Sequence, residues 1–520
     1  MIKAKKLYFI FFFSVIFVLN LIFSASYFFI DESQKPKFSA NNDHCIAFEW
    51  YKTWSVSDHD IGYGITIDNF DNIIITGTVR YYGSTYNDIF LIKFNNLGNS
   101  QWGSIWGSNK DDYGDEVVTD NIGNVYVMGT TGNYLAERSD IILSKINNSG
   151  IIQWNIKWGS AIYNWGRGID IDDSGNIYVA GITNDIATGK GDLCFIKFDN
   201  SGNIIWNKTY GGIESDYCEQ IILDDYGNIY AIGSTYSYGL GDCNIYLLKL
   251  NNSGNLEWYT TWGGVQNEYG EGIVLDSLGN IYIVGTYSMY QNGYYNDLLL
   301  LKFDNAGIIQ WNVSWGGIDS DYGKKVTLDD LGNLFVLGNT KSYGSGGYDA
   351  CILKFDDSGH IEWETTWGGV YDDYGMDLTF DSIGNLYITG STESYSQDYD
   401  LMLIKYGVDS DNDGLSDYVE LNLYSTNPNN SDTDNDKLSD GDEILNFLTD
   451  PNKWDTDGDG YSDYDEIFIY GTNPNNFYSN LSILLMLSLL ILIMLIPIVI
   501  FSYLKLKERR KYKKQKINKT

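Results

Sequence analysis

Short apolar segments recur along most of the chain at a nearly constant spacing. The copies read DNIIITG (71–77), GNVYVMG (123–129), GNIYVAG (175–181), GNIYAIG (227–233), GNIYIVG (279–285), GNLFVLG (332–338) and GNLYITG (384–390). Tryptophans keep the same rhythm at positions 50, 102, 154, 206, 258, 311 and 363, so the period is 52 residues with one interval of 53. Such regularity indicates one supersecondary unit that is repeated seven times.

The hydrophobic pattern of one repeat predicts four strands. Within residues 270–315 we expect them at 270–276, 280–286, 297–303 and 308–315. The second and third are apolar at consecutive positions, which favours strands buried on both faces. In the fourth, Ile309 and Trp311 alternate with polar residues, as is typical of an edge strand with one packed face. Four antiparallel strands of this kind make one propeller blade.

The two ends of the repeat array predict how the ring closes. The seventh copy has its first three strands at about 375–405 but no fourth strand. Before the first copy, residues 45–54 supply an isolated fourth strand with Trp50 and Trp54 in place. We therefore predict an all-β, seven-bladed propeller of four-stranded antiparallel blades over residues 45–407, in which the N-terminal strand completes the last blade.

The repeat resembles the bacterial seven-bladed beta-propeller (SBBP) repeat, whose members carry WGG, DYG, DxxGNIYVxG and KxDxxGxxxW segments. The resemblance covers all seven copies, with local departures such as Cys218 for the Gly of DYG. It implies a surface or secreted binding scaffold, and it implies no particular ligand.

Aspartates follow the propeller at a spacing that suits a metal ion. Three loops, 23 residues apart, place acids at positions 1, 3, 5, 9 and 12. Calcium takes six to eight oxygen ligands, and a backbone carbonyl at position 7 is among them in loops of this spacing. The predicted ligands are Asp409, Asp411, Asp413, Leu415, Asp417 and Glu420; Asp432, Asp434, Asp436, Leu438, Asp440 and Glu443; and Asp455, Asp457, Asp459, Tyr461, Asp463 and Glu466.

Residues 408–476 resemble bacterial thrombospondin type 3 calcium repeats in this spacing and in their Thr-Asn/Asp-Pro spacers. We expect calcium to stiffen them into a stalk; the alternative is a solvated acidic spacer. Lys437 stands where the other two loops carry Gly at position 6, so the second loop should bind calcium more weakly.

Both ends of the chain carry membrane signals. Lys3, Lys5 and Lys6 precede an apolar run, which predicts a signal peptide over 1–26 or an uncleaved anchor. Residues 481–504 carry no charge and predict a transmembrane helix, and the basic tail 505–520 should be cytoplasmic. We expect a cell-membrane protein whose main body is extracellular, with one membrane span, or two if the N-terminal segment is retained.

A possible ligand face lies at the turns before the first strands. Each turn carries Asp, Asn or Glu, usually followed by an aromatic residue, and we expect the Tyr-rich loops between second and third strands at the same face. Our favoured interpretation of the acidic turns is that they cap and pack the blades. The candidate ligand residues are Asp112, Tyr113, Tyr269, Tyr287, Tyr290, Tyr294, Tyr295, Tyr322 and Tyr374.

The five cysteines are too few and too scattered for a disulfide framework. Cys218 and Cys243 belong to one repeat and fall in two loops that should emerge on one face. We therefore suggest that they pair.

Charge and composition exclude several classes of function. A net charge of −35 argues against binding to nucleic acid. The three histidines show no metal-ligand or triad spacing, so we predict no catalytic residues and no enzyme. The prediction is a surface protein that recognises glycans or surface proteins, with calcium as its only cofactor. The alternatives are a structural coat component or an extracellular lyase or hydrolase.

Overall fold

The computed structural model describes residues 45–55, 59–81, 84–133, 138–159, 163–184, 189–289, 295–395 and 398–517. The predicted signal segment 1–26 lies outside them. The chain divides into two compact units, one from Glu49 to Gly407 and one that contains Val408–Thr520 and the residues up to Phe48. Each unit is described by itself.

The first unit is built from blades of four strands each, which we number first to fourth. The first strands are β2 (His59–Ile67), β6 (Asp112–Thr119), β10 (Asn164–Ile171), β14 (Asp216–Leu223), β18 (Glu268–Leu275), β22 (Asp321–Leu328) and β26 (Asp373–Phe380). The second strands are β3 (Ile73–Arg80), β7 (Val125–Asn133), β11 (Ile177–Asn184), β15 (Ile229–Thr235), β19 (Ile281–Met289), β23 (Leu334–Thr340) and β27 (Leu386–Thr392).

The third strands are β4 (Asp88–Phe94), β8 (Arg138–Ile146), β12 (Gly191–Phe198), β16 (Asn244–Leu250), β20 (Tyr295–Phe303), β24 (Asp349–Phe355) and β28 (Asp400–Asp409). The fourth strands are β5 (Ser100–Trp106), β9 (Ile152–Trp158), β13 (Ile204–Tyr210), β17 (Leu256–Trp262), β21 (Ile309–Trp315), β25 (Ile361–Trp367) and, from the N-terminus, β1 (Cys45–Trp54). Both lists apply to the described part of the chain.

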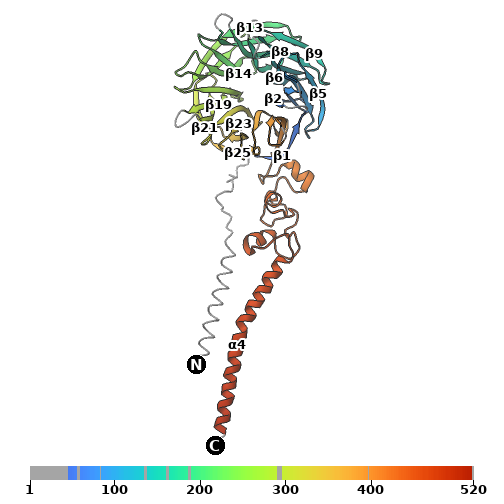
Figure 1. The fold of residues 1–520 in the computed structure, drawn as a ribbon, viewed down its shortest axis with the longest axis vertical. Helices are drawn as coiled ribbons and strands as arrows, with labels where there is room; N and C mark the ends of the chain where they lie inside the picture. The colour runs from blue at the N-terminus through green and yellow to red at the C-terminus, as the bar shows by residue number, and fades with distance from the viewer. Residues whose placement is uncertain are drawn as a thin grey trace. The chain divides into compact units, whose positions relative to one another are not determined.

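These strands form seven four-stranded antiparallel sheets. Six sheets follow the chain order, and the seventh has the order β1-β28-β27-β26. The predicted seven-bladed propeller and its closure by the N-terminal strand are therefore confirmed. In Figure 1 the first strands β2 and β6 lie towards the middle of the ring, and the fourth strands β5 and β9 lie at its rim.

The pattern of apolar residues along a strand matches its burial in the blade. The second strand β15 is buried at every residue, whereas the fourth strand β21 alternates exposed and half-buried positions. The fourth-strand tryptophans join neighbouring blades. Trp102 donates its indole N–H to the carbonyl of Asn148 in the next blade (3.1 Å). A Cβ on Gly150 of that turn would lie 2.8 Å from the Trp102 ring, so glycine is required there.

The second unit contains short helical segments and one long helix. They are α2 (Asp417–Val419), η2 (Glu420–Tyr424), α3 (Asp440–Asp442), η3 (Glu443–Phe447), η4 (Asp465–Tyr470) and α4 (Ser479–Ile517). Among the described residues, none of the helices combines the length and the apolar character that crossing a membrane requires. The transmembrane helix predicted at 481–504 therefore has no support in the structure.

The suggested pairing of Cys218 with Cys243 is wrong, because both residues are free and buried. Cys218 replaces the Gly of DYG on β14, and its side chain packs in the apolar core between two blades. Its sulfur lies 3.9 Å from the carbonyl oxygen of Gln220, whereas the Cys243 sulfur lies 3.7 Å from that of Glu268. Each thiol is thus part of the packing at a different place.

Candidate functional site

One residue of every first strand is extruded from the strand pairing. In β10, Gly166 pairs with Gly181 and Gly168 pairs with Ala180, so Arg167 between them is a β-bulge. A bulge redirects one side chain without ending the strand. The seven bulge residues, which we call the bulge ring, are Tyr63, Asp115, Arg167, Glu219, Glu271, Lys324 and Met376.

A second set of half-buried side chains lies two residues before the bulge ring. Along each first strand the burial alternates: the acid or amide at the start is buried, the next residue is half-buried, the third is buried and the bulge residue is half-buried. The half-buried set, which we call the aromatic collar, is Tyr113, Trp165, Tyr217, Tyr269, Tyr322 and Tyr374. The collar and the bulge ring together form the central site.

Buried polar side chains close the middle of the ring next to the bulge residues. Lys325 Nζ lies 2.6 Å from Glu116 Oε1 and 3.4 Å from Asp377 Oδ1, so blades two, six and seven meet there. Gly168, in a blade between them, is held by close packing, because a Cβ on it would lie 2.7 Å from the Ile221 nitrogen. These contacts fix the first strands against one another, and three of the bulge residues, Tyr63, Asp115 and Arg167, face a cavity.

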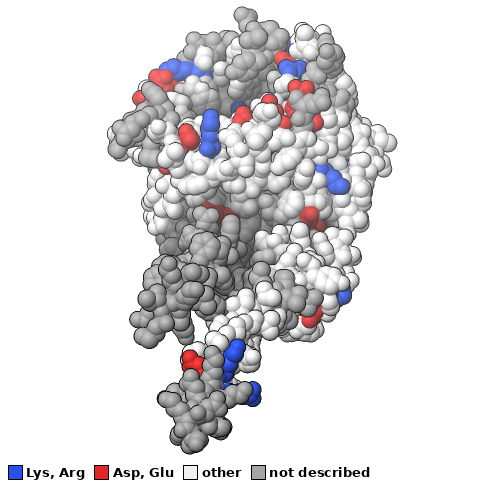
Figure 2. All heavy atoms as spheres, turned by 60° about the horizontal axis from the view of Figure 1, so that its bottom comes forward, with Lys and Arg blue, Asp and Glu red and all other residues white. Residues whose placement is uncertain are grey.

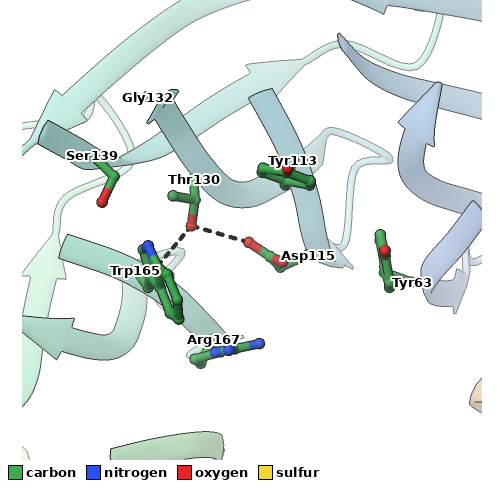
Figure 3. Close-up of a pocket in the computed structure, with 9 residues that line it drawn as sticks. Tyr63, Tyr113, Asp115, Thr130, Gly132, Ser139, Trp165 and Arg167 are labelled. Carbon is green, nitrogen blue, oxygen red and sulfur yellow. Dashed lines mark hydrogen bonds between the residues drawn. The ribbon is translucent and has the colours of Figure 1, made fainter. Parts of the chain in front are cut away.

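That cavity measures about 320 Å³ and lies between the first three blades. Its wall combines three aromatic rings with one acid and one guanidinium group (Figure 3). The lining residues are Tyr63, Tyr113, Asp115, Thr130, Gly132, Ser139, Trp165, Gly166 and Arg167. A second cavity of about 330 Å³ shares Trp165 and extends to Tyr217.

Asp115 and Arg167 set the electrostatics of the first cavity. Thr130 Oγ1 donates a 3.3 Å hydrogen bond to Asp115 Oδ2 and accepts one from the Gly166 nitrogen (3.2 Å). Burial raises the pKa of Asp115 to about 7. Arg167 lies 5.5 Å from the centre of the Trp165 ring, and its Nε is 3.5 Å from Glu219 Oε2. Burial raises the pKa of Glu219 to about 7 as well.

The predicted ligand-face residues fall into four groups. Tyr113, Tyr269, Tyr322 and Tyr374 belong to the aromatic collar, and Tyr287 and Tyr295 are half-buried on β19 and β20. Asp112 is buried and accepts a hydrogen bond from the Ser108 nitrogen (2.5 Å), so its carboxylate packs the turn, and its ligand role stays a prediction. Tyr290 and Tyr294 lie outside the described residues.

The turn acids pack the blades, as our favoured interpretation held. Asp321 accepts hydrogen bonds from the Gly317 nitrogen (2.9 Å) and from the hydroxyls of Thr340 (2.5 Å) and Ser342 (2.7 Å). A Cβ on Gly316 would lie 2.5 Å from Asp297 Oδ1 and 2.7 Å from Asp321 Oδ2. The glycine after the fourth-strand tryptophan therefore makes room for two neighbouring carboxyl groups.

The same arrangement occurs at the next blade junction. A Cβ on Gly368 would overlap Asp349 Oδ1 and lie 2.9 Å from Asp373 Oδ2. Within the described part of the chain, Asp349 Oδ1 is buried without a hydrogen-bond partner. Burial raises the pKa of Asp349 to about 6.

The bulge ring was not predicted. Charges of both signs vary at this position from repeat to repeat, while the position before it is Gly in six of the seven copies. That contrast was the available signal. On the face shown in Figure 2, acidic and basic side chains are scattered rather than gathered into a patch of one sign.

The acidic loops of the second unit have the geometry expected for calcium. In each loop the oxygens of the first three acids lie within 4.8 Å of one another, as in Asp409, Asp411 and Asp413. The acid at position 1 is held by backbone N–H groups, since Asp409 accepts from Asn412 (2.8 Å) and Gly414 (3.0 Å). The loop backbone therefore orients the carboxylate at position 1 without help from a bound ion.

Other carboxylate oxygens in these loops lack a donor. Among the described residues, both oxygens of Asp411 and one oxygen each of Glu420, Asp434, Glu443 and Asp457 are buried without a hydrogen-bond partner. Burial, followed by neighbouring carboxylates, raises the pKa of Glu420 to about 8 and that of Glu443 to about 9. Buried, unpartnered carboxylates at positions 3 and 12 are the ligands that calcium requires, so the residues fit the ion.

The acids at position 9 have a different environment. Asp417 accepts hydrogen bonds from the backbone nitrogen (2.9 Å) and hydroxyl (2.8 Å) of Ser410, and Asp440 and Asp463 bond Thr433 and Thr456 in the same way. Asp440 also lies within 4.8 Å of Asp413 and Glu420 of the preceding repeat. The hydrogen bonds at position 9 hold each loop together, and Asp417, Asp440 and Asp463 stay predicted calcium ligands. The carbonyls of Leu415, Leu438 and Tyr461 stay predicted ligands.

Lys437 has the backbone conformation that its position demands. Its φ is +90°, against +98° for Gly414 and +99° for Gly460 at the same place in the other loops. A residue with a Cβ is strained there, which is the reason for the predicted weaker second site.

The comparisons with known proteins identify the second unit. Residues 409–431, 432–453 and 455–476 match the family described as the bacterial TSP3 repeat. One curated protein, the regulatory protein FlaEY of Caulobacter vibrioides, is 28% identical over 112 residues, which are 19% of this chain and 12% of that protein. The chain thus spans a small part of that relative.

Solved structures resemble the propeller in fold alone. The WD40 domain of Neurospora crassa Pan2 is 12% identical with a TM-score of 0.46, covering 71% of this chain and 97% of that domain. The polysaccharide lyase Uly1 is 9% identical with a TM-score of 0.44, covering 74% and 94%. The NanB sialidase of Streptococcus pneumoniae is 12% identical with a TM-score of 0.39, covering 72% of each. The chain is a seven-bladed β-propeller of four-stranded antiparallel blades followed by three bacterial TSP3 repeats.

Proposed function

We propose that the protein is an extracellular recognition protein: the propeller binds a glycan or a surface protein at its central site, and the TSP3 repeats act as a calcium-stiffened connector. The observation that carries the proposal is the pairing of the aromatic collar with the charged bulge ring. Aromatic rings give large contact areas at low entropic cost, and charged groups next to them give orientation. Millimolar calcium outside cells suits sites of the extracellular class, which supports the proposed location.

Calcium would be held in each repeat by carboxylates at positions 1, 3, 5 and 12, as in Asp409, Asp411, Asp413 and Glu420. When bound, the ion supplies positive charge that neutralises these acids. Asp440 of the second loop lies next to Asp413 and Glu420 of the first loop, so an ion in the first loop would also neutralise an acid of the second. Successive repeats then stiffen together rather than one by one.

The test is binding of the full chain to purified cell-envelope material, with calcium and with a chelator. We expect saturable binding that Trp165→Ala weakens at least about tenfold, as removal of a central aromatic contact does at other interfaces. The matched control is Tyr226→Ala, which removes an 83% exposed aromatic ring just beyond the other end of a first strand. Equal binding by both variants and the parent protein would exclude the central site.

A second candidate is an extracellular lyase or hydrolase, and one observation favours it. Asp115 and Glu219 are two carboxyl groups of the bulge ring whose pKa is about 7, a value suited to proton transfer near neutral pH. We prefer binding because Glu219 is paired with Arg167. Release of reducing ends from envelope polysaccharides, abolished by Asp115→Asn, would reverse that preference.

A further inference from the structure

The cavity between the first three blades has features that narrow its ligand class. Aromatic rings of Tyr63, Tyr113 and Trp165 form part of its wall, and a volume of about 320 Å³ is at the lower end of the range for small-molecule sites. These three side chains come from three different blades, so a ligand ring inserted between them would be contacted from more than one side (Figure 3). Apolar ring faces favour a ligand with an apolar face of its own.

The polar groups of the cavity offer both kinds of hydrogen bond. The Asp115 carboxylate is an acceptor, and the hydrogen bond it receives from Thr130 is a long one of 3.3 Å. The Arg167 guanidinium is a donor only, and it contacts Glu219 through Nε. Neighbouring hydroxyl groups both donate and accept, so a pair of them can bond an acid and a guanidinium at once.

The mixture of charges disfavours ions. An anionic ligand would meet Asp115, with Glu219 next to Arg167, and a cationic ligand would meet Arg167 itself. A phosphate-bearing ligand is disfavoured further by the chain's net charge of −35. A metal ion is disfavoured because, among the described residues that line the cavity, Asp115 is the only carboxylate.

The geometry points to a subsite for a neutral sugar ring, held by Asp115 and Arg167 through two adjacent hydroxyls and by Trp165 and Tyr113 through its apolar face. This inference rests on the proposed recognition function and names the ligand class of the same central site. The Arg167 guanidinium, which stacks 5.5 Å from the Trp165 ring, couples the polar and the aromatic contacts.

The test follows Trp165 directly. The full chain is labelled with 5-fluorotryptophan, and the Trp165 resonance is assigned as the fluorine signal missing from Trp165→Phe. The probes are neutral methyl glycosides of glucose, galactose and N-acetylglucosamine, an anionic methyl glucuronide and a cationic methyl glucosaminide. We expect at least one neutral glycoside to shift the resonance saturably in the millimolar range, with both charged probes at least about tenfold weaker.

Variants separate the subsite from general effects. Asp115→Asn should weaken the neutral glycoside about tenfold, and Arg167→Lys should do the same because it keeps the charge and loses the planar fork. The matched control, Tyr226→Ala, removes an exposed ring outside the central site and should leave the affinity unchanged. If Asp115→Asn does not fold, Arg167→Lys alone decides.

Each outcome discriminates between the two proposals. A charged probe that binds as tightly as the neutral ones, or no shift of the Trp165 resonance by any probe, overturns the sugar subsite. If the chain still binds envelope material in that case, the recognition function stands with another ligand. If envelope binding is absent too, both proposals fall.

Discussion

The propeller and the TSP3 repeats both bury aspartates at regular intervals, yet they treat them in opposite ways. In the propeller, Asp321 is surrounded by donors from the protein's own backbone and hydroxyl groups. In the repeats, Asp411 has two buried oxygens and Glu443 has one with no donor among the described residues. A buried carboxylate is stable only when something compensates its charge. The propeller supplies donors to Asp321 from its own chain, whereas Asp411 and Glu443 of the repeats must take their compensation from solution.

Calcium removal should therefore separate the two regions most clearly. A ligand present at 100 times its Kd stabilises a site by about 2.7 kcal/mol, and there are three loops. With a chelator we expect proteolysis within 408–476 to accelerate at least about 100-fold, because cleavage follows the population of open states. Limited proteolysis with mass spectrometry measures it.

The propeller serves as the internal control. Its melting transition should be the same with calcium and with chelator, since the groups of acids that could hold a metal ion, among the described residues, all lie in the repeats. A propeller transition that falls along with the repeats would contradict the comparison. An unchanged cleavage pattern in 408–476 would remove the proposed role of calcium.

Replacing one buried carboxylate should lower the unfolding free energy of the propeller. Asp321→Asn replaces one of the two acceptor oxygens with a donor NH₂ group. That group would stand opposite the Gly317 N–H and the Ser342 hydroxyl if it replaced Oδ2, or opposite the Thr340 hydroxyl if it replaced Oδ1. Hydrogen bonds to a charged group contribute about 1.5–3 kcal/mol each in favourable cases, so we expect a loss of about 3 kcal/mol. Denaturant unfolding of the propeller transition gives the value.

The matched control is Asp319→Asn, an acid two residues earlier whose side chain has no part in this cluster. It should change the unfolding free energy by less than about 0.5 kcal/mol. Equal losses for the two variants would mean that charge alone, rather than the hydrogen bonds, explains the effect.

The fold could be predicted well from the sequence because the strand pattern of one blade occurs seven times. The period, the buried second strands and the isolated strand at 45–54 determine blade number and closure. The groups of acids that could hold a metal ion were equally accessible, since Asp409, Asp411 and Asp413 belong to one continuous loop. The bulge ring could not be read in this way. The sequence has no direct sign of a β-bulge, and only the bulge turns Asp115 and Arg167 towards the same cavity.

Burial of two neighbouring acids at one blade junction should make the folding stability of the propeller depend on pH. The pKa of Asp349 is raised to about 6, so the folded state resists its ionisation. A raised acid pKa costs nothing below the unfolded value near 4, and the cost grows as the pH rises through about 6. Asp349→Asn removes the cost, and we expect about 1–2 kcal/mol of stabilisation at pH 8 and little change at pH 4.

One junction of the protein already carries the substitution. Asn244 occupies the equivalent position in another blade, and its Nδ2 donates to Glu268 Oε2 (3.1 Å). Melting curves from pH 4 to pH 8 compare Asp349→Asn with the parent chain. Stabilisation that is equal at both pH values would show that the effect is packing rather than charge.

The smallest predicted effect lies within the repeats, at the loop that departs from its neighbours. Lys437→Gly relieves a φ of +90° that costs a residue with a Cβ about 1 kcal/mol, so the second loop should bind calcium about fivefold more tightly. The substitution also removes a positive charge and the contact of Lys437 Nζ with the Tyr464 ring at 5.0 Å. Lys437→Ala removes the same charge and contact but keeps the strain. The difference in calcium affinity between the two variants, measured by calorimetry on the full chain, therefore isolates the backbone contribution. If Lys437→Gly and Lys437→Ala bind equally, strain at position 6 does not weaken the second site, and the side chain alone sets it apart.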